Sequence, residues 1–174
     1  QWQHYSDEVL KVSVNVSPQQ FRTGSLLIDV ENALSSSGLG NDQLELEITE
    51  NLLIQDSEKP LEVLDKLHER GISLALDDFG TGYSSLSYLR RFPLQVLKID
   101  RSFISELKTD PNNEVLVDTI IAMAHSLGLE TVAEGVENDD QLDFLRLRGV
   151  KIVQGYLFSP PVPVETFHEL LQQQ

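Results

Sequence analysis

Two adjacent aspartates, Asp77 and Asp78, end an aliphatic run in the segment LALDDFGTG, residues 74–82. Neighbouring side chains of a regular strand point to opposite faces, but Gly80 and Gly82 give the backbone freedom to turn, so that both carboxylates can face one site. Two carboxylates about 4 Å apart repel each other by roughly 4 kcal/mol at an effective dielectric constant near 20. The pair therefore requires a proton on one carboxylate or a bound cation. The structural alternative is a helix N-cap followed by a turn residue.

Polar residues end the other predicted strands as well. They are Asn15, Glu47 with Glu50, Lys98 with Asp100, Glu134 with Glu137, and Gln154. Each has a simpler explanation when it is taken alone: a turn residue, an outward-facing strand residue or a buried amide with satisfied hydrogen bonds. All six predicted strands end in this way, however, and in a barrel the strand ends meet at one mouth. The set as a whole therefore favours a common site.

The side chains of this set favour a hard divalent cation. Their ligand atoms are oxygens, with no cysteine in the chain and no histidine at a predicted strand end, which suits Mg²⁺ or Mn²⁺. Asn15 and Glu47 would complete a site with the two aspartates, and Glu134 could hold a second ion. Paired metal ions suit the in-line attack of water on a phosphoryl centre. The four histidines fall in helical patterns, so we expect surface or helix-packing roles for them.

Lys98 lies between apolar neighbours in VLKID, residues 96–100. Strand alternation places it on one face with Val96 and Asp100. A lysine that faces a barrel interior is costly unless it is paired. Beside carboxylates it would stay charged, and it could orient the attacking water or bind phosphate. The alternative is an outward-facing lysine in a short, edge-like strand.

The elements that would position these residues alternate along the chain. Strand patterns occupy residues 10–16, 44–50, 73–79, 96–100, 130–136 and 151–158. Helical patterns lie near residues 24–37, 57–70, 84–91, 113–127, 138–148 and 164–172. Alternating strands and helices predict parallel pairing with right-handed crossovers.

Two architectures contain such units, an open doubly wound sheet and a barrel. The first predicted strand ends in NVSPQQF, residues 15–21, which is not the Gly-rich phosphate loop of an open sheet. Polar residues at the ends of many strands are typical of a barrel. We therefore predict an α/β fold, an incomplete (β/α)8 TIM-like barrel. About six βα units are present and the N-terminal units are missing, since a full barrel takes about 250 residues.

The composition of the chain excludes some classes of binding partner. The chain has 174 residues and a formal net charge of −15, opposite in sign to that of a sequence-independent nucleic-acid binder, so we expect no duplex DNA or RNA partner. We find no apolar run of membrane-spanning length and no signal segment, and expect no membrane contact. The absence of cysteine excludes disulfides and is compatible with the cytoplasmic location that we expect. The chain opens with Gln1, as a fragment would.

The chain resembles the EAL domain, a bacterial phosphodiesterase that opens cyclic di-GMP to the linear dinucleotide pGpG. The resemblance runs from about Leu10 to the end, through VSVNVS, ELEITEN, DDFGTGYSSLSYL, LKIDRSFI, ETVAEGVE and VQGYLFSPP. It implies metal-dependent hydrolysis of cyclic di-GMP in second-messenger signalling, with Mg²⁺ or Mn²⁺ as the cofactor. It also implies a homodimer, and allows flanking sensory or GGDEF-type domains.

The resemblance assigns metal ligands by position. Asn15, Glu47 and Asp77 would bind the first ion, and Asp78 would bind the second ion or bridge both. Glu134 would hold the second ion or its water.

The resemblance also assigns the remaining roles. Lys98 would orient the nucleophilic water, and Gln154 would hold metal-bound water. Glu50 would stabilise the loop that follows Asp78, which in the family couples metal occupancy to the dimer interface.

One expected motif is missing. The Glu-Ala-Leu sequence that names the family, with its metal-binding glutamate and the arginine behind it that contacts substrate, would lie upstream of Gln1. Residues 1–174 would then be a partial EAL domain, the C-terminal two-thirds of the barrel, and we expect its hydrolysis to be weak or absent. Two alternatives stay open. One is a non-catalytic cyclic di-GMP receptor or signalling scaffold, and the other is an unrelated metal-assisted barrel enzyme.

Overall fold

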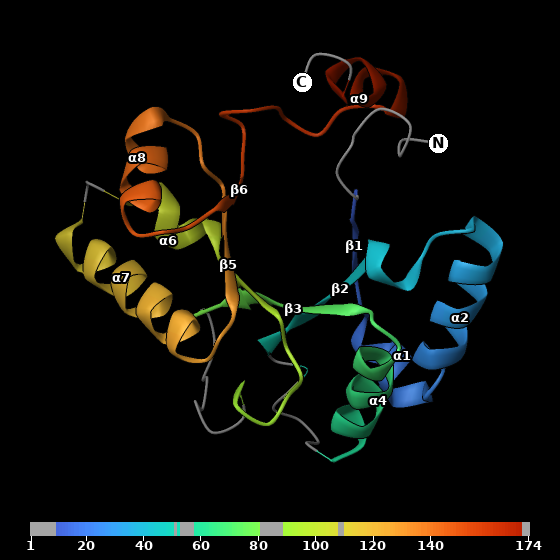
Figure 1. The fold of residues 1–174 in the computed structure, drawn as a ribbon. Helices are drawn as coiled ribbons and strands as arrows, with labels where there is room; N and C mark the ends of the chain where they lie inside the picture. Colours follow the sequence, from blue (N-terminus) through green and yellow to red (C-terminus); the bar gives the residue numbers. More distant parts are fainter. Residues whose placement is uncertain (1–9, 51, 53–57, 81–88, 108–109, 172–174) are drawn as a thin grey trace.

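The computed structural model describes residues 10–50, 52, 58–80, 89–107 and 110–171. Six strands within these ranges form a parallel sheet (Figure 1). The strand order follows the chain, β1-β2-β3-β4-β5-β6. The strands are β1 Val12–Asn15, β2 Leu44–Thr49, β3 Ser73–Phe79, β4 Val96–Ile99, β5 Glu130–Glu134 and β6 Ile152–Gln154. The sheet curls and the helices lie on its outside, which confirms the predicted incomplete barrel.

Helices follow β1, β2, β4, β5 and β6 along the chain. They are α1 Pro18–Thr23, α2 Leu26–Ser37, the 3-10 helix η2 Asn41–Gln43, α4 Glu58–Glu69, α6 Arg101–Ser105, α7 Pro111–Ser126, α8 Asp139–Leu147 and α9 Val164–Leu171. Within the described ranges, no helix is both long enough and apolar enough to cross a membrane.

The predicted elements are present with some changes. All six strands form, although the last one ends at Gln154 rather than at residue 158. Two short helices, α1 and α6, were not predicted. Ser17 caps α1, and Asp100 caps α6 by accepting a hydrogen bond from the Ser102 N–H. Asp100 therefore has a structural role that its grouping with the site residues missed. The helix predicted near residues 84–91 lies largely outside the described residues.

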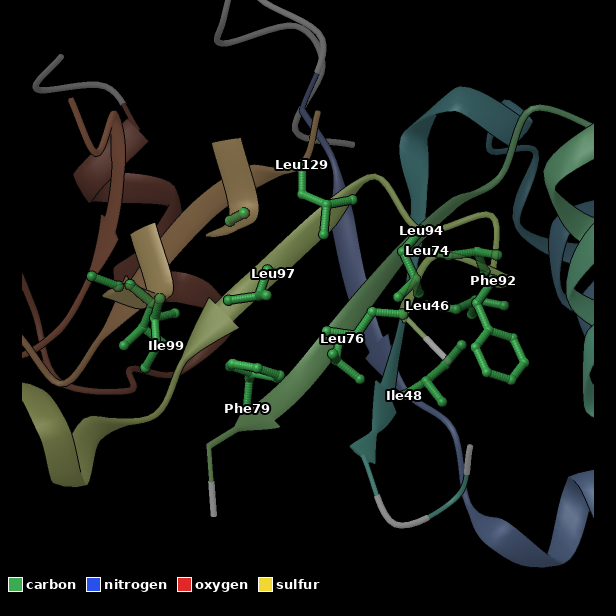
Figure 2. Packing of buried hydrophobic residues seen from close by; sticks show 14 of the residues in the cluster. Leu46, Ile48, Leu74, Leu76, Phe79, Phe92, Leu94, Leu97, Ile99 and Leu129 are labelled. Carbon is green, nitrogen blue, oxygen red and sulfur yellow. The ribbon is translucent and has the colours of Figure 1, made fainter. Parts of the chain in front are cut away.

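The core lies between the outer face of the sheet and the helices (Figure 2). Leu74 and Leu76 of β3 and Leu97 of β4 point into it and are fully buried. Burial of such a side chain contributes about 1.5–3 kcal/mol. Because side chains alternate along a strand, the intervening residues, such as Ala75 and Val96, lie in a separate small cluster on the concave face. The residues at the strand ends that point to this concave face lie at the barrel mouth.

A buried carboxylate ties the first three strands together below the mouth. Glu45 accepts hydrogen bonds from Ser13 Oγ of β1 and from Ser73 Oγ of β3, both at 3.0 Å. These three residues are direct neighbours across the sheet. Two residues further along, on the same face, β1 and β2 carry the paired residues Asn15 and Glu47. The hydrogen bonds of Glu45 therefore help to fix the relative positions of Asn15 and Glu47 at the strand ends.

The first and last strands are open edges. β1 pairs with β2 and β6 pairs with β5, and no other pairing involves these two strands in the described part of the chain. Val14 of β1 is 44% exposed and Ile152 of β6 is 43% exposed. Open edges of this kind can pair with further strands.

Candidate active site

Three carboxylates from different strands meet one ammonium group at the barrel mouth. Lys98 Nζ of β4 lies 2.6 Å from Glu47 Oε1 of β2, 2.7 Å from Glu134 Oε1 of β5 and 3.2 Å from Asp77 Oδ1 of β3. Lys98 is 5% exposed. The structure thus brings together four of the residues that we assigned to one site. We call these four residues the Lys98 cluster.

Burial and ion pairing act in opposite directions on the Lys98 cluster. Burial alone would lower the pKa of the Lys98 ammonium, but its hydrogen bonds with Glu134 and Glu47 outweigh this effect and hold the pKa above its ordinary value. Desolvation raises the pKa of Glu134 despite the hydrogen bond from Lys98, and the charges of Asp77 and Glu47 add to the increase. With all groups ionised, the cluster carries two more negative charges than positive ones.

Asp78 occupies a left-handed turn at the end of β3. Its φ is +55°, and it is the one non-glycine residue with positive φ in the described ranges. The turn continues through Gly80, whose φ is +97°, as the sequence predicts. Asp78 as a whole is exposed, but partial desolvation of its carboxylate raises its pKa. The charges of Asp77 and Asp100 raise this pKa further. The fold therefore keeps Asp78 in an unfavourable backbone conformation beside the like charge of Asp77, which is typical of functional positions.

Glu50 lies beneath the start of the loop that follows this turn. The Gly80 N–H points to Glu50 Oε2 at 3.4 Å. Glu50 is 5% exposed, and its Oε1 is buried without a hydrogen-bond partner among the described residues. This position agrees with the expected contact to the loop. The role itself stays a prediction, because residues 81–88 lie outside the described residues.

Asn15 and Gln154 flank the Lys98 cluster without joining it. Asn15 is the register partner of Glu47, and Gln154 is the register partner of Glu134. Both side chains are exposed, and no hydrogen bond joins either one to the cluster within the described part of the chain. Gln154 lines a cavity of about 300 Å³ on the concave face of the sheet, together with Glu47 and Lys98.

The chemistry of the site fits a hard cation. Carboxylate oxygens from three strands already converge on a single positive charge, the Lys98 ammonium. Among the described residues, no three carboxylate or imidazole side chains form a metal site ready for occupation. A divalent ion would therefore share these carboxylates with Lys98 and would neutralise their excess charge. The described histidines lie in α4, α7 and α9, away from the strand ends, as expected.

Two glycines beside site residues were missed by the sequence analysis. A Cβ on Gly135, which follows Glu134, would lie 2.5 Å from Arg101 Cβ. A Cβ on Gly155, which follows Gln154, would lie 2.0 Å from the carbonyl oxygen of Val136. The ends of β5 and β6 are therefore packed through main chain, and no local sequence pattern reveals such a contact.

Replacement of Gly155 by alanine is expected to displace the end of β6 and to destabilise the chain by about 1–3 kcal/mol, the usual range for overpacking. The Val136 atoms that it would strike belong to the backbone, which cannot move aside as a side chain can. Urea denaturation measures the free energy of unfolding, and NMR shifts of Gln154 report its displacement. Gly40→Ala is the matched control, because its nearest obstacle is the flexible Asp42 carboxylate. Equal stability of Gly155→Ala and the parent chain would refute the expected clash.

Two exposed aromatic side chains were also missed. Tyr156 is 64% exposed and Phe158 is 58% exposed, and both follow Gln154 at the barrel mouth. The segment VQGYLFSPP served as a motif in the sequence analysis, but its aromatic residues received no role. Their exposure to solvent is what marks them as candidate binding residues, and a local pattern of apolar residues does not predict that exposure.

Comparison with known proteins gives consistent matches. The EAL domain family model matches residues 1–161. The chain is 47% identical over 165 residues to the cyclic di-GMP phosphodiesterase NbdA of Pseudomonas aeruginosa. The alignment covers 95% of this chain and 21% of NbdA. The chain therefore spans about a fifth of the length of that relative.

Two solved structures share the fold. The PaMucR phosphodiesterase in complex with c-di-GMP has a TM-score of 0.86 and 42% identity, and the match covers 90% of this chain and 64% of that one. Klebsiella pneumoniae BlrP1 in complex with manganese and c-di-GMP has a TM-score of 0.79 and 32% identity, over 87% of this chain and 39% of that one.

Proposed function

Because the chain belongs to the EAL domain family, we propose that it acts on cyclic di-GMP, hydrolysing it to linear pGpG with the help of Mg²⁺ or Mn²⁺. The observation that carries this proposal is the Lys98 cluster, in which carboxylates from three strands surround one ammonium group at the barrel mouth. The phosphodiesterase relative NbdA and the manganese complex of BlrP1 support the substrate and the type of metal.

In this proposal the acidic residues hold the cation. A bound divalent ion would polarise the phosphodiester and lower the pKa of a water molecule. Asn15, Glu47 and Asp77 would be ligands of a first ion, Asp78 would serve a second ion, and Glu134 would stand beside it. The two negative charges in excess within the Lys98 cluster supply the attraction.

Lys98 acts as a fixed positive charge. Since its pKa lies above the ordinary value, the ammonium keeps its proton at neutral pH and cannot serve as a base. It can donate a hydrogen bond to the attacking water or to a phosphate oxygen, while Glu47 and Glu134 hold it in place. The Gln154 amide, which is the register partner of Glu134, would orient water from the neighbouring strand.

The exposed aromatic residues suit the bases of the substrate. Tyr156 and Phe158 present large exposed surfaces next to Gln154. Stacking of a base on an aromatic side chain contributes about 1–3 kcal/mol. In this proposal they bind a guanine of cyclic di-GMP while its phosphate lies toward the Lys98 cluster.

The proposal is tested by incubating the chain with cyclic di-GMP and Mn²⁺ and separating the products by chromatography. We expect pGpG to form slowly, because the Glu-Ala-Leu motif with its metal-binding glutamate is not among residues 1–174, and we expect EDTA to stop its formation. The same samples are titrated with cyclic di-GMP in a calorimeter. A chain that neither binds nor cleaves cyclic di-GMP would contradict the proposal.

A receptor function is the second candidate. It is favoured by the state of the carboxylates, since three of them are already engaged by Lys98 in the described structure. Binding of cyclic di-GMP without any pGpG, in the presence of either metal, would select this function over hydrolysis.

A further inference from the structure

The barrel mouth has more negative than positive charge, whereas its proposed ligand is an anion. Asp77, Asp78 and Glu134 stand at the strand ends, and the chain as a whole carries a formal charge of −15. A cyclic dinucleotide brings two phosphodiester charges of its own. Lys98 is enclosed by three carboxylates, so its charge is already balanced within the site. The proposed divalent ions would offset the carboxylates, and a further cationic side chain at the mouth would strengthen binding of the anionic ligand.

Arg101 is placed to supply that cation. It is the first residue of α6, one position beyond the Asp100 cap, and it is exposed. Among the described residues, Lys98 and Arg101 are the two basic residues that stand at or immediately after the carboxyl end of a strand. The other basic residues of the described ranges lie in helices farther along the chain from a strand end, at strand beginnings or in the connections that precede strands.

The charge of Arg101 has no partner within the described part of the chain. Arg70 pairs with Glu31, and Arg148 pairs with Asp118. The neighbouring acid, Asp100, is engaged otherwise, since its Oδ1 accepts hydrogen bonds from the N–H and the hydroxyl of Ser102.

The base of the Arg101 side chain is held against the site. A Cβ on Gly135 would lie 2.5 Å from Arg101 Cβ and 3.3 Å from Arg101 Cα, so the absence of a side chain at Gly135 makes room for this contact. Gly135 directly follows Glu134, whose carboxylate contacts Lys98. The Arg101 side chain therefore starts one residue away from the Lys98 cluster.

We propose that Arg101 binds a phosphodiester oxygen of the cyclic dinucleotide and thereby contributes to substrate affinity. This inference rests on the proposed function. A guanidinium offers paired N–H donors that match two oxygens of one phosphate. Its contact with the ligand is formed on binding and does not involve the metal ligands.

The test measures binding of cyclic di-GMP to the chain by calorimetry, with Ca²⁺ and without added metal, at several salt concentrations. Arg101→Gln is expected to raise Kd about tenfold, the effect of losing one charge-assisted hydrogen bond. It is also expected to weaken the salt dependence of Kd. Arg101→Lys retains the charge and is expected to give an intermediate Kd. In turnover assays the increase should fall on KM, with kcat changed less than about twofold.

Arg146→Gln is the matched control, because Arg146 is exposed in the last turn of α8, at the end of the helix that leads to the start of β6. It should leave Kd unchanged. If the parent chain binds and Arg101→Gln binds equally well with the same salt dependence, the inference about Arg101 is wrong while the proposed function stands. If the parent chain does not bind cyclic di-GMP, both are wrong.

Discussion

Replacement of Asp78 by asparagine is expected to lower kcat for cyclic di-GMP hydrolysis at least about 100-fold, the scale set by loss of one preorganised electrostatic contact. The substitution removes a charge that the proposed second cation would use, but it preserves the shape of the side chain. Asparagine also tolerates the φ of +55° at this position, so the turn should persist. Because desolvation and the charges of Asp77 and Asp100 disfavour the Asp78 carboxylate, the free energy of unfolding should stay equal or increase slightly.

Two further variants separate the effect of the lost charge at Asp78 from any effect on the backbone turn. Asp78→Ala removes the same charge but places a less tolerant residue in the left-handed turn, so it should lose stability as well as activity. Asp143→Asn removes an exposed carboxylate of α8 and should leave both unchanged. Product formation with Mn²⁺ and urea denaturation without metal supply the two readouts. Full activity of Asp78→Asn would refute the role proposed for this carboxylate.

Replacement of Lys98 by methionine is expected to lower the free energy of unfolding by about 3–5 kcal/mol in the absence of metal, the cost of leaving buried charges unpaired. Methionine retains much of the volume of lysine, so the loss should come from the three carboxylates of Glu47, Asp77 and Glu134. Urea denaturation at pH 8 measures it. Lys66→Met, which removes an exposed lysine of α4, is the control and should have little effect.

The destabilisation of Lys98→Met should depend on pH and on metal. The pKa of Glu134 is raised in the folded chain even beside Lys98, and removal of the ammonium raises it further. A carboxyl with a raised folded-state pKa binds more protons in the folded state, so stability falls as pH rises above the unfolded value near 4.3. The variant should therefore approach the parent chain near pH 4 and differ most at pH 8, where Mn²⁺ should partly restore it. A loss of stability independent of pH would point to packing instead of charge.

The alternation of strands and helices was readable from the sequence because each element obeys a local rule. Leu74 and Leu76 alternate with Ala75 and Asp77, so the face of β3 that enters the core and the face that lines the barrel are both fixed by spacing. Parallel strands bring their carboxyl ends to one edge. These two rules suffice to predict that Glu47, Asp77, Lys98 and Glu134 approach one another, and the structure brings them together.

The tertiary structure decided which of these groups touch and which stay apart. Glu47 and Lys98 are separated by 51 residues, and the curl of the sheet determines that their charged atoms meet at 2.6 Å. It also leaves Asn15 and Gln154 exposed beside the cluster and assigns Asp100 to the cap of α6. The close contact of Gly135 with Arg101 likewise depends on how two strand ends pack. Sequence periodicity defines faces, whereas contact distances depend on the path of the whole backbone, so no local pattern could have supplied them.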